Sequence, residues 1–250
     1  MQIVNKIGVI GMGSMGKLIA RYASRWGQVE YFDNQVIESD HASPVELRQV
    51  CLADIVFLVV PLGAYTKLLP QIAKHLNPEA IFVDVASVKL EPERLIKQHL
   101  GRHQHILLSH PLFGPESASA SLENHKFIVT LATGRAQQLV DFLDKNLNLD
   151  VIRKTALEHD QAMAQVQGLT FFLSRALDVY GLNGQSTGLE TPSFSWVKGL
   201  AELDKHHSQE LLETIQVYNP EAVKARQQLL DILIKLNQDY ANQHGSDRLS

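Results

Sequence analysis

Residues 6–33 of the chain, KIGVIGMGSMGKLIARYASRWGQVEYFD, decide its fold. The apolar run at 7–10 is typical of a buried strand, and three glycines follow it directly in the spacing G-x-G-x-x-G. Apolar residues then recur at the helical period, a second apolar run covers 29–32, and Asp33 stands at the carboxyl end of that run. The stretch therefore predicts a strand, a tight glycine turn, a helix and a second strand parallel to the first.

Each glycine in this stretch has a separate expected task. Gly11 permits the tight turn, Gly13 lets the backbone approach a pyrophosphate, and Gly16 lets the helix pack closely on the strand. The helix N-terminus offers unpaired N–H groups to the phosphates, while Asp33 would bond the adenosine ribose and repel a 2′-phosphate. We therefore predict a dinucleotide site that favours NAD, with NADP as the alternative. The expected contact residues are Gly11, Met12, Gly13, Ser14, Met15, Gly16, Asp33, Pro61 and Leu62.

Length and composition are those of an ordinary globular protein. Of the 250 residues, 45% are apolar and 20% are charged, and the formal net charge is −4. Because the chain has neither a basic run nor an apolar run of membrane-spanning length, we expect no nucleic-acid or membrane partner. The single cysteine, Cys51, excludes a multi-cysteine metal site and is expected to be a buried thiol. No signal-peptide pattern precedes the first strand, so we expect a cytoplasmic protein.

Strands and helices alternate over the first 152 residues. This alternation predicts a doubly wound α/β sheet, a Rossmann domain covering 1–152. The expected later strands are 55–60, 81–85, 106–108, 127–130 and 151–152, and the expected helices are 43–47, 64–75 and 135–146.

After residue 152 the pattern becomes helical. Apolar residues recur at helical spacing over 159–180, two helical pieces are expected within 191–217, and Asn219-Pro220-Glu221 is a helix start. We predict that 153–250 form an all-helical substrate and dimerisation domain. Because its helices are apolar on more than one face, we expect a homodimer joined through this domain.

Two candidate catalytic residues lie where strands end. Ligands of an open α/β sheet bind beyond the carboxyl ends of the strands. Ser87 follows the strand at 81–85, and His110 follows the strand at 106–108. A histidine beside a nicotinamide can accept a proton near pH 7. The same positions also fit a histidine that only caps a strand, a serine in an ST-turn and a solvent-exposed Lys89, so position alone leaves these roles open.

Three stretches resemble one enzyme family. DVASVK at 84–89 and SHPLFGPES at 109–117 are similar to paired signatures of the prephenate and arogenate dehydrogenases, most of all the plant-type arogenate branch. EHDQAMAQVQGLTFFLSRAL at 158–177 is similar to the long helix that follows the dinucleotide domain in that family. The resemblance implies an oxidoreductase that decarboxylates prephenate to 4-hydroxyphenylpyruvate, or arogenate to tyrosine, with hydride transfer to a nicotinamide cofactor.

The resemblance also implies roles for single residues. His110 matches the catalytic histidine, and Ser87 matches the serine that orients the substrate hydroxyl. His159 and Asp160 match a His-Asp pair at the start of the helical domain, which could equally be a helix-start feature. Glu116 could be structural or reach the substrate. The implied substrate-binding residues are Ser87, Lys89, His110, Glu116, Arg175 and Tyr218, and no metal is implied.

Two positions depart from the family pattern. Phe171 stands where family members often carry a histidine, and Tyr218 stands where bacterial relatives carry an arginine for the substrate carboxylate. Either another cation binds that carboxylate, with Arg175, Lys224 and Arg226 as candidates, or the substrate differs.

Two other functions fit the same fold. A β-hydroxyacid or imine reductase usually carries a catalytic lysine or acid on its inter-domain helix, but 161–180 contains no lysine and Asp178 lies far along it. A catalytically impaired, cofactor-sensing homologue would explain Phe171 and Tyr218, although Ser87, Lys89 and His110 together favour an enzyme.

Overall fold

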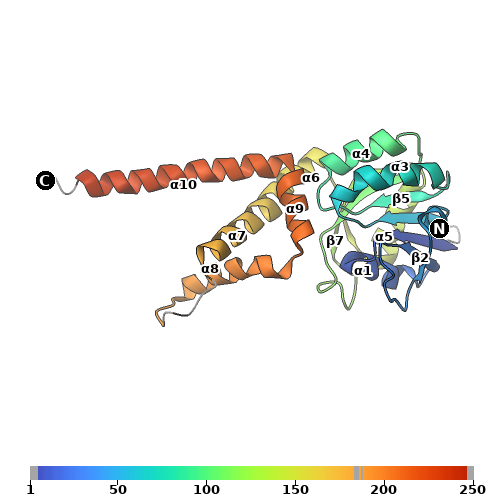
Figure 1. Cartoon of the computed structure of the whole chain (residues 1–250), viewed down its shortest axis with the longest axis horizontal. Helices are drawn as coiled ribbons and strands as arrows, with labels where there is room; N and C mark the ends of the chain where they lie inside the picture. Colours follow the sequence, from blue (N-terminus) through green and yellow to red (C-terminus); the bar gives the residue numbers. More distant parts are fainter. Residues whose placement is uncertain (1–4, 183–185, 187, 247–250) are drawn as a thin grey trace. The chain divides into compact units, whose positions relative to one another are not determined.

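The structure, a computed structural model, describes residues 5–182, 186 and 188–246. The chain divides into two compact units, Met1–His159 and Asp160–Ser250 (Figure 1). The first unit holds the sheet, and the second is built from helices.

The first unit contains one eight-stranded sheet in the order β3-β2-β1-β4-β5-β6-β7-β8. Every neighbouring pair is parallel except β6 and β7, which are antiparallel. The strand order reverses between β1 and β4, which is where such sheets bind their ligands. The strands are β1 (Lys6–Ile10), β2 (Gln28–Phe32), β3 (Ser43–Pro44), β4 (Ile55–Leu58), β5 (Ile81–Asp84), β6 (Ile106–Pro111), β7 (Lys126–Ala132) and β8 (Asp150–Arg153).

Helices cover both faces of this sheet, as the buried strands require. In Figure 1, α3 and α4 lie on one face, and α1 and α5 lie on the other. All six residues of β6 are buried, which matches a strand between two helix layers. The doubly wound fold predicted from the sequence is therefore confirmed. The helices of this unit are α1 (Ser14–Ala23), α2 (Leu47–Val50), η1 (Leu62–Ala64), α3 (Tyr65–His75), α4 (Leu90–Leu100) and α5 (Ala136–Leu147).

The structure corrects the prediction at three places. The helix expected at 43–47 is wrong, because Ser43 and Pro44 form the edge strand β3 beside β2, where a proline need not donate a hydrogen bond. Helix α4 was not predicted, although Glu91 and Glu93 lie in its first turn. Strand β6 continues three residues beyond the predicted end at 108.

Cys51 is a buried thiol, as predicted. Its side chain is fully buried, and this burial raises the pKa of the thiol to about 11. It therefore stays protonated and serves as a small core residue.

The second unit is helical throughout its described residues. The helix predicted at 159–180 forms, but its middle is a π-helix, where Gly168 packs against Ala222 and a side chain on Gly168 would crowd that residue. The side chain of Asn219 caps the last helix, as predicted, because its Oδ1 accepts from the N–H of Glu221 at 3.0 Å. The elements are α6 (Ala156–Met163), which runs across the division between the units, η2 (Ala164–Leu169), α7 (Thr170–Tyr180), α8 (Pro192–Glu202), η3 (Leu203–His206), α9 (Gln209–Tyr218) and α10 (Pro220–Ser246). Within the described residues, none of these helices is long and apolar enough to span a bilayer.

Candidate active site

The glycine loop between β1 and α1 allows no side chain at two of its three glycines. Gly11 has a φ of 101°, and a Cβ there would lie 2.2 Å from the carbonyl oxygen of Val59. A Cβ on Gly16 would lie 2.0 Å from the carbonyl oxygen of Gly11. The loop therefore packs closely against the residues that follow β4 and against the first turn of α1. This agrees with the tight turn at Gly11 and the close packing at Gly16 that the sequence predicts.

Gly13 differs from its two neighbours, because a Cβ there would meet nothing within 4 Å. This residue is the N-cap of α1, where no side chain caps the helix and the first turn holds no acidic residue. An open approach to an uncapped helix N-terminus fits the phosphates of a dinucleotide. The geometry of the loop thus fits the cofactor that the sequence predicts.

Asp33 lies beside this loop. Its Oδ2 accepts a hydrogen bond from the backbone N–H of Met12 at 2.7 Å, and its Oδ1 accepts one from the N–H of Gln35 at 3.2 Å. The carboxylate is thereby fixed at the end of β2, next to the glycine turn. The other predicted cofactor residues differ in exposure: Ser14 and Pro61 are exposed, Met15 is half-buried, and the side chains of Met12 and Leu62 are buried.

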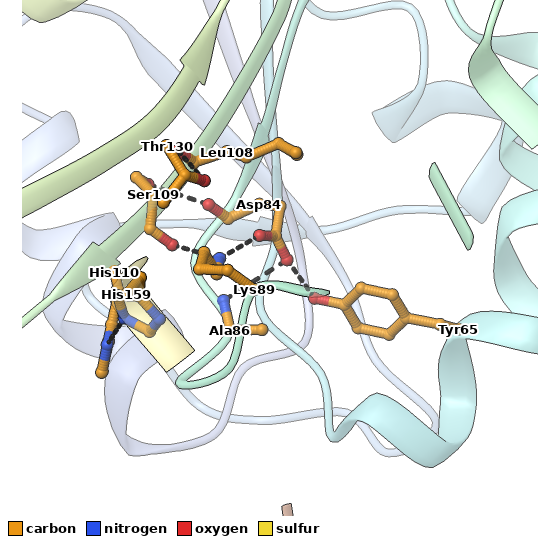
Figure 2. Close-up of polar contacts among 9 residues, drawn as sticks. All are labelled: Tyr65, Asp84, Ala86, Lys89, Leu108, Ser109, His110, Thr130 and His159. Carbon is orange, nitrogen blue, oxygen red and sulfur yellow. Dashed lines mark hydrogen bonds and ion pairs between the residues drawn. The ribbon is translucent and has the colours of Figure 1, made fainter. Parts of the chain in front are cut away.

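A buried ion pair lies at the ends of β5 and β6. Lys89 and Asp84 are both fully buried, and Lys89 Nζ pairs with Asp84 and also donates to the carbonyl oxygen of Ser109 (Figure 2). Tyr65 donates its hydroxyl to Asp84 Oδ1 at 2.5 Å, and Ser109 Oγ donates to the carbonyl oxygen of Asp84 at 2.8 Å. The alternative of a solvent-exposed Lys89 is therefore wrong.

This network joins two neighbouring strand ends through one lysine. The lysine is anchored at the start of α4, and its ammonium holds the carbonyl of the residue that precedes His110. A buried charge pair is tolerated only when its hydrogen bonds are satisfied, and Tyr65 supplies the additional donor. Burial first, and Asp84 second, raise the pKa of Tyr65 well above its usual value, so its hydroxyl remains a donor.

A β-bulge precedes His110. The pairing of β6 with β7 changes register between Leu108 and Ser109, so that Thr130 becomes the extra residue on β7. Bulges of this kind re-aim the side chains that follow them and are frequent next to active sites. Here the bulge lies directly before the predicted catalytic histidine.

His110 is buried and contacts a second histidine. Its Nδ1 lies 2.9 Å from Nε2 of His159, and the two rings meet edge to face (Figure 2). Burial, the neighbouring His159 and the positive charge of Lys89, in this order, lower the pKa of His110 well below its usual value of 6.5. The imidazole is therefore neutral at physiological pH.

The remaining predicted substrate residues belong to other segments of the chain. Ser87 is half-buried in the loop between β5 and α4, two residues before Lys89. Glu116 is exposed in the loop after β6, and Arg175 and Tyr218 belong to the second unit. Their roles toward a substrate stay predictions.

The three cations considered for the substrate carboxylate already have partners in the second unit. Arg175 lies 3.4 Å from Asp178, and Lys224 lies 2.7 Å from Glu221. Arg226 donates to the carbonyl oxygen of Gln216 at 2.8 Å. Phe171, which stands where the resemblance implies a histidine, is buried, and its ring centroid lies 4.6 Å from that of His207.

Sequence reasoning named His110 and Lys89 but did not assign roles to the residues that hydrogen-bond around them. Tyr65 belongs to no motif, since an ordinary buried tyrosine has the same local pattern, and Ser109 was quoted as part of SHPLFGPES without a role. Asp84 was quoted as part of DVASVK without a role. His159 was placed at the start of the helical domain, and the capping-box spacing of Thr155 and Glu158 could also have indicated that its helix begins just after Thr155.

Comparisons with known proteins point to one family. Residues 30–149 match the family model described as prephenate dehydrogenase, nucleotide-binding domain, a stretch that includes Asp33, Lys89 and His110. The chain is 27% identical over 240 residues to arogenate dehydrogenase 2, chloroplastic, from Arabidopsis thaliana, covering 90% of this chain and 66% of the relative. It is 28% identical over 174 residues to the T-protein of Haemophilus influenzae, covering 68% of this chain and 43% of the relative. The chain thus spans less than two thirds of the length of these curated relatives.

Solved structures share the fold over nearly the whole chain. Synechocystis arogenate dehydrogenase has a TM-score of 0.67 at 24% identity, covering 96% of this chain and 93% of that one. Prephenate dehydrogenase from A. aeolicus, crystallised with hydroxyphenyl propionate and NAD+, has a TM-score of 0.71 at 18% identity, with coverage of 98% and 94%. The resemblance recognised from the sequence motifs is confirmed: the chain is similar to the prephenate and arogenate dehydrogenases, in its nucleotide-binding part by the family model and over most of its length by the plant relative.

Proposed function

We propose that this protein oxidatively decarboxylates prephenate, to 4-hydroxyphenylpyruvate, or arogenate, to tyrosine, with hydride transfer to NAD. The similarity to prephenate and arogenate dehydrogenases supports this reaction class. The observation that carries the proposal is His110, a buried and neutral histidine at the carboxyl end of β6. No described residue forms a hydrogen bond with its Nε2, so this nitrogen is available to a substrate.

The cofactor would be held by the glycine loop and Asp33. Bound NAD would supply the hydride acceptor. The backbone at Gly13 and the N-terminus of α1 would bind the pyrophosphate, because a Cβ at Gly13 would meet open space. Asp33 would bond the adenosine ribose hydroxyls, and its negative charge supports NAD over NADP.

The protein has to supply one base and a fixed geometry. The substrate is a cyclohexadienol that loses hydride from the carbon bearing its hydroxyl, while CO₂ leaves the opposite ring carbon as the ring becomes aromatic. His110 would take the hydroxyl proton on Nε2, which only a neutral imidazole can do. The positive charge of Lys89 helps to keep His110 neutral. Ser87 would orient the hydroxyl.

The test is turnover of both substrates with both cofactors. We expect reduced nicotinamide and CO₂ to form in equal amounts from prephenate or arogenate, and faster with NAD than with NADP. Absence of turnover on both substrates, together with tight binding of NAD, would overturn the proposal and leave a cofactor-sensing protein.

We also propose that the protein is a homodimer joined through its helical unit. Every residue at 230–243 of α10 is exposed, and these residues include Leu230, Leu233 and Leu236, which recur at helical spacing. An apolar stripe of this length is rarely left in water. Light scattering should give twice the chain mass, and a monomeric mass would contradict the proposal.

A variant pair locates the dimer contact. Leu233→Glu should shift the mass toward the monomer, because it buries a charge in the joined face. Gln238→Glu, an exposed polar position on the same helix, should leave the mass unchanged. A dimer that survives Leu233→Glu would place the contact elsewhere.

A further inference from the structure

The contact between His110 and His159 has two arrangements when both rings are neutral. The two facing nitrogens, 2.9 Å apart, share one proton, so one ring donates and the other accepts. If His159 donated, His110 would carry its own proton on Nε2 and could not act as a base there. If His110 donates from Nδ1, its Nε2 has a free lone pair. Only the second arrangement makes His110 a base toward a substrate.

We propose that His159 is a positioning residue for His110, whose Nε2 accepts the hydrogen bond from His110 Nδ1 and so holds the base in its active tautomer and orientation. This inference rests on the proposed function of His110. The role is separate from that of a substrate contact, because His159 acts through another side chain.

The chain fixes His159 at the start of a helix. Thr155 Oγ1 accepts from the N–H of Glu158 at 3.2 Å, and Glu158 Oε2 accepts from the N–H of Thr155 at 2.8 Å. This reciprocal capping box defines the first turn of α6, and the N–H of His159 bonds the carbonyl oxygen of Thr155 at 2.9 Å. His159 is 2% exposed, so its ring has little freedom to turn. It is thereby presented to β6 as a fixed acceptor.

The charges around His110 and His159 bear on the proton that His110 takes from the substrate. The buried Lys89 is the cation that acts on His110, and its own partners are Asp84 and the carbonyl oxygen of Ser109. When the substrate O–H bond breaks, the proton forms an N–H bond at His110 Nε2, and the positive charge strengthens the existing bond from Nδ1 to His159. Because His159 Nε2 accepts this bond, it carries no proton of its own while His110 is charged.

Two substitutions at His159 separate positioning from packing. His159→Leu removes the acceptor, and we expect kcat to fall at least about tenfold, while KM and the Kd for NAD stay nearly unchanged. His159→Gln places an amide oxygen near the position of Nε2 and should restore most of kcat. His75→Leu, at the exposed end of α3, is the matched control and should behave like the wild type. Equal kcat in the leucine variant and the wild type, or equal losses in both His159 variants, would overturn the inference.

Nuclear magnetic resonance of the free protein provides a measurement that needs no turnover. Long-range ¹⁵N–¹H spectra of histidine-labelled protein distinguish protonated from unprotonated ring nitrogens, and His110→Asn assigns the signals. We expect His110 to be protonated on Nδ1 in the wild type and in His159→Gln, and to populate the Nε2-protonated form in His159→Leu. Wild-type His110 protonated on Nε2 would overturn the inference. Because this result does not depend on substrate, it remains decisive even if neither prephenate nor arogenate is turned over.

Discussion

The two strand-end regions of the sheet are built in opposite ways. At the ends of β1 and β2 the predicted binding groups are mainly backbone groups. A Cβ on Gly13 would meet open space, and no side chain caps the N-terminus of α1. At the ends of β5 and β6 the strands are joined by buried side chains, among them the fully buried pair of Lys89 and Asp84. An open, uncapped helix N-terminus of this kind fits a phosphate without any side chain having to move. The second region has to hold charges in place before any ligand arrives.

This difference predicts how each region responds to substitution. A site made of backbone is disrupted when a side chain is added, because the new Cβ clashes with neighbouring atoms or cannot adopt the positive φ of the glycine. A buried side-chain network loses stability when one member is removed, because the remaining charge stays buried without its partner. Substitutions at the two ends should therefore separate effects on binding from effects on folding.

The largest expected effect is at Lys89. Lys89→Met leaves the buried Asp84 unpaired, and we expect the free energy of unfolding to fall by about 3–5 kcal/mol. Urea denaturation measures this loss. Lys97→Met, which breaks an exposed pair with Glu93 on the same helix, should change stability by less than about 1 kcal/mol. Equal losses of unfolding free energy in the two variants would mean that the buried pair stabilises the fold no more than the exposed pair does.

Alanine at two glycines should distinguish folding from binding at the other end. Gly11→Ala combines a φ of 101° with a Cβ that would meet the oxygen of Val59, and we expect a stability loss of at least about 1–3 kcal/mol. Gly13→Ala should keep stability within about 0.5 kcal/mol but weaken NAD, because its methyl would enter the cofactor's approach. Thermal melts and calorimetric titration provide the two readouts. Unchanged NAD affinity in Gly13→Ala would contradict a cofactor at this loop.

Asp33→Ser should change cofactor choice by a smaller amount. We expect NAD affinity to fall about tenfold, or about 1.4 kcal/mol, and NADP affinity to fall less. Because Asp33 also holds the N–H of Met12, part of the loss will be shared by both cofactors. Asp54→Ser, just before β4, is the control, since among the described residues its carboxylate accepts from the backbone N–H groups of Asn5 and Lys6 at the far end of β1. Equal losses for NAD and NADP in Asp33→Ser would show that this carboxylate does not read the ribose.

The smallest expected effect is that of pH in the neutral range. Burial, His159 and Lys89 lower the pKa of His110, and only the neutral ring accepts a proton, so kcat/KM should be flat from the usual value of 6.5 upward and fall only in more acidic solution. A rate profile measured with full-length enzyme tests this. An acidic limb centred at or above 6.5 would contradict a buried, neutral His110.

How much the sequence predicts also differs between the two regions. The glycine loop, α1 and Asp33 follow from spacing, because each role depends on a residue type at a fixed offset. His110 and Ser87 could be placed at strand ends for the same reason. The confirmed N-cap at Asn219 is again a local pattern.

The supporting network could not be predicted because it is made by contacts distant in sequence. Tyr65 meets Asp84 across 19 residues, and His110 meets His159 across 49. The bulge before Ser109 depends on the register in which β6 pairs with the antiparallel β7, and the predicted strand at 127–130 carried no local signal for that register. Such features require the assembled sheet.

The most direct test of the central claim is the kinetics of His110→Asn. We expect kcat on prephenate or arogenate to fall at least about a hundredfold, with an NAD dissociation constant within about a factor of two of the wild type, because the variant loses the base and keeps the loop. Asparagine retains a polar side chain that can still face His159, which limits the change in packing. Near-normal turnover by His110→Asn would contradict the account and reduce His110 to a residue that ends a strand.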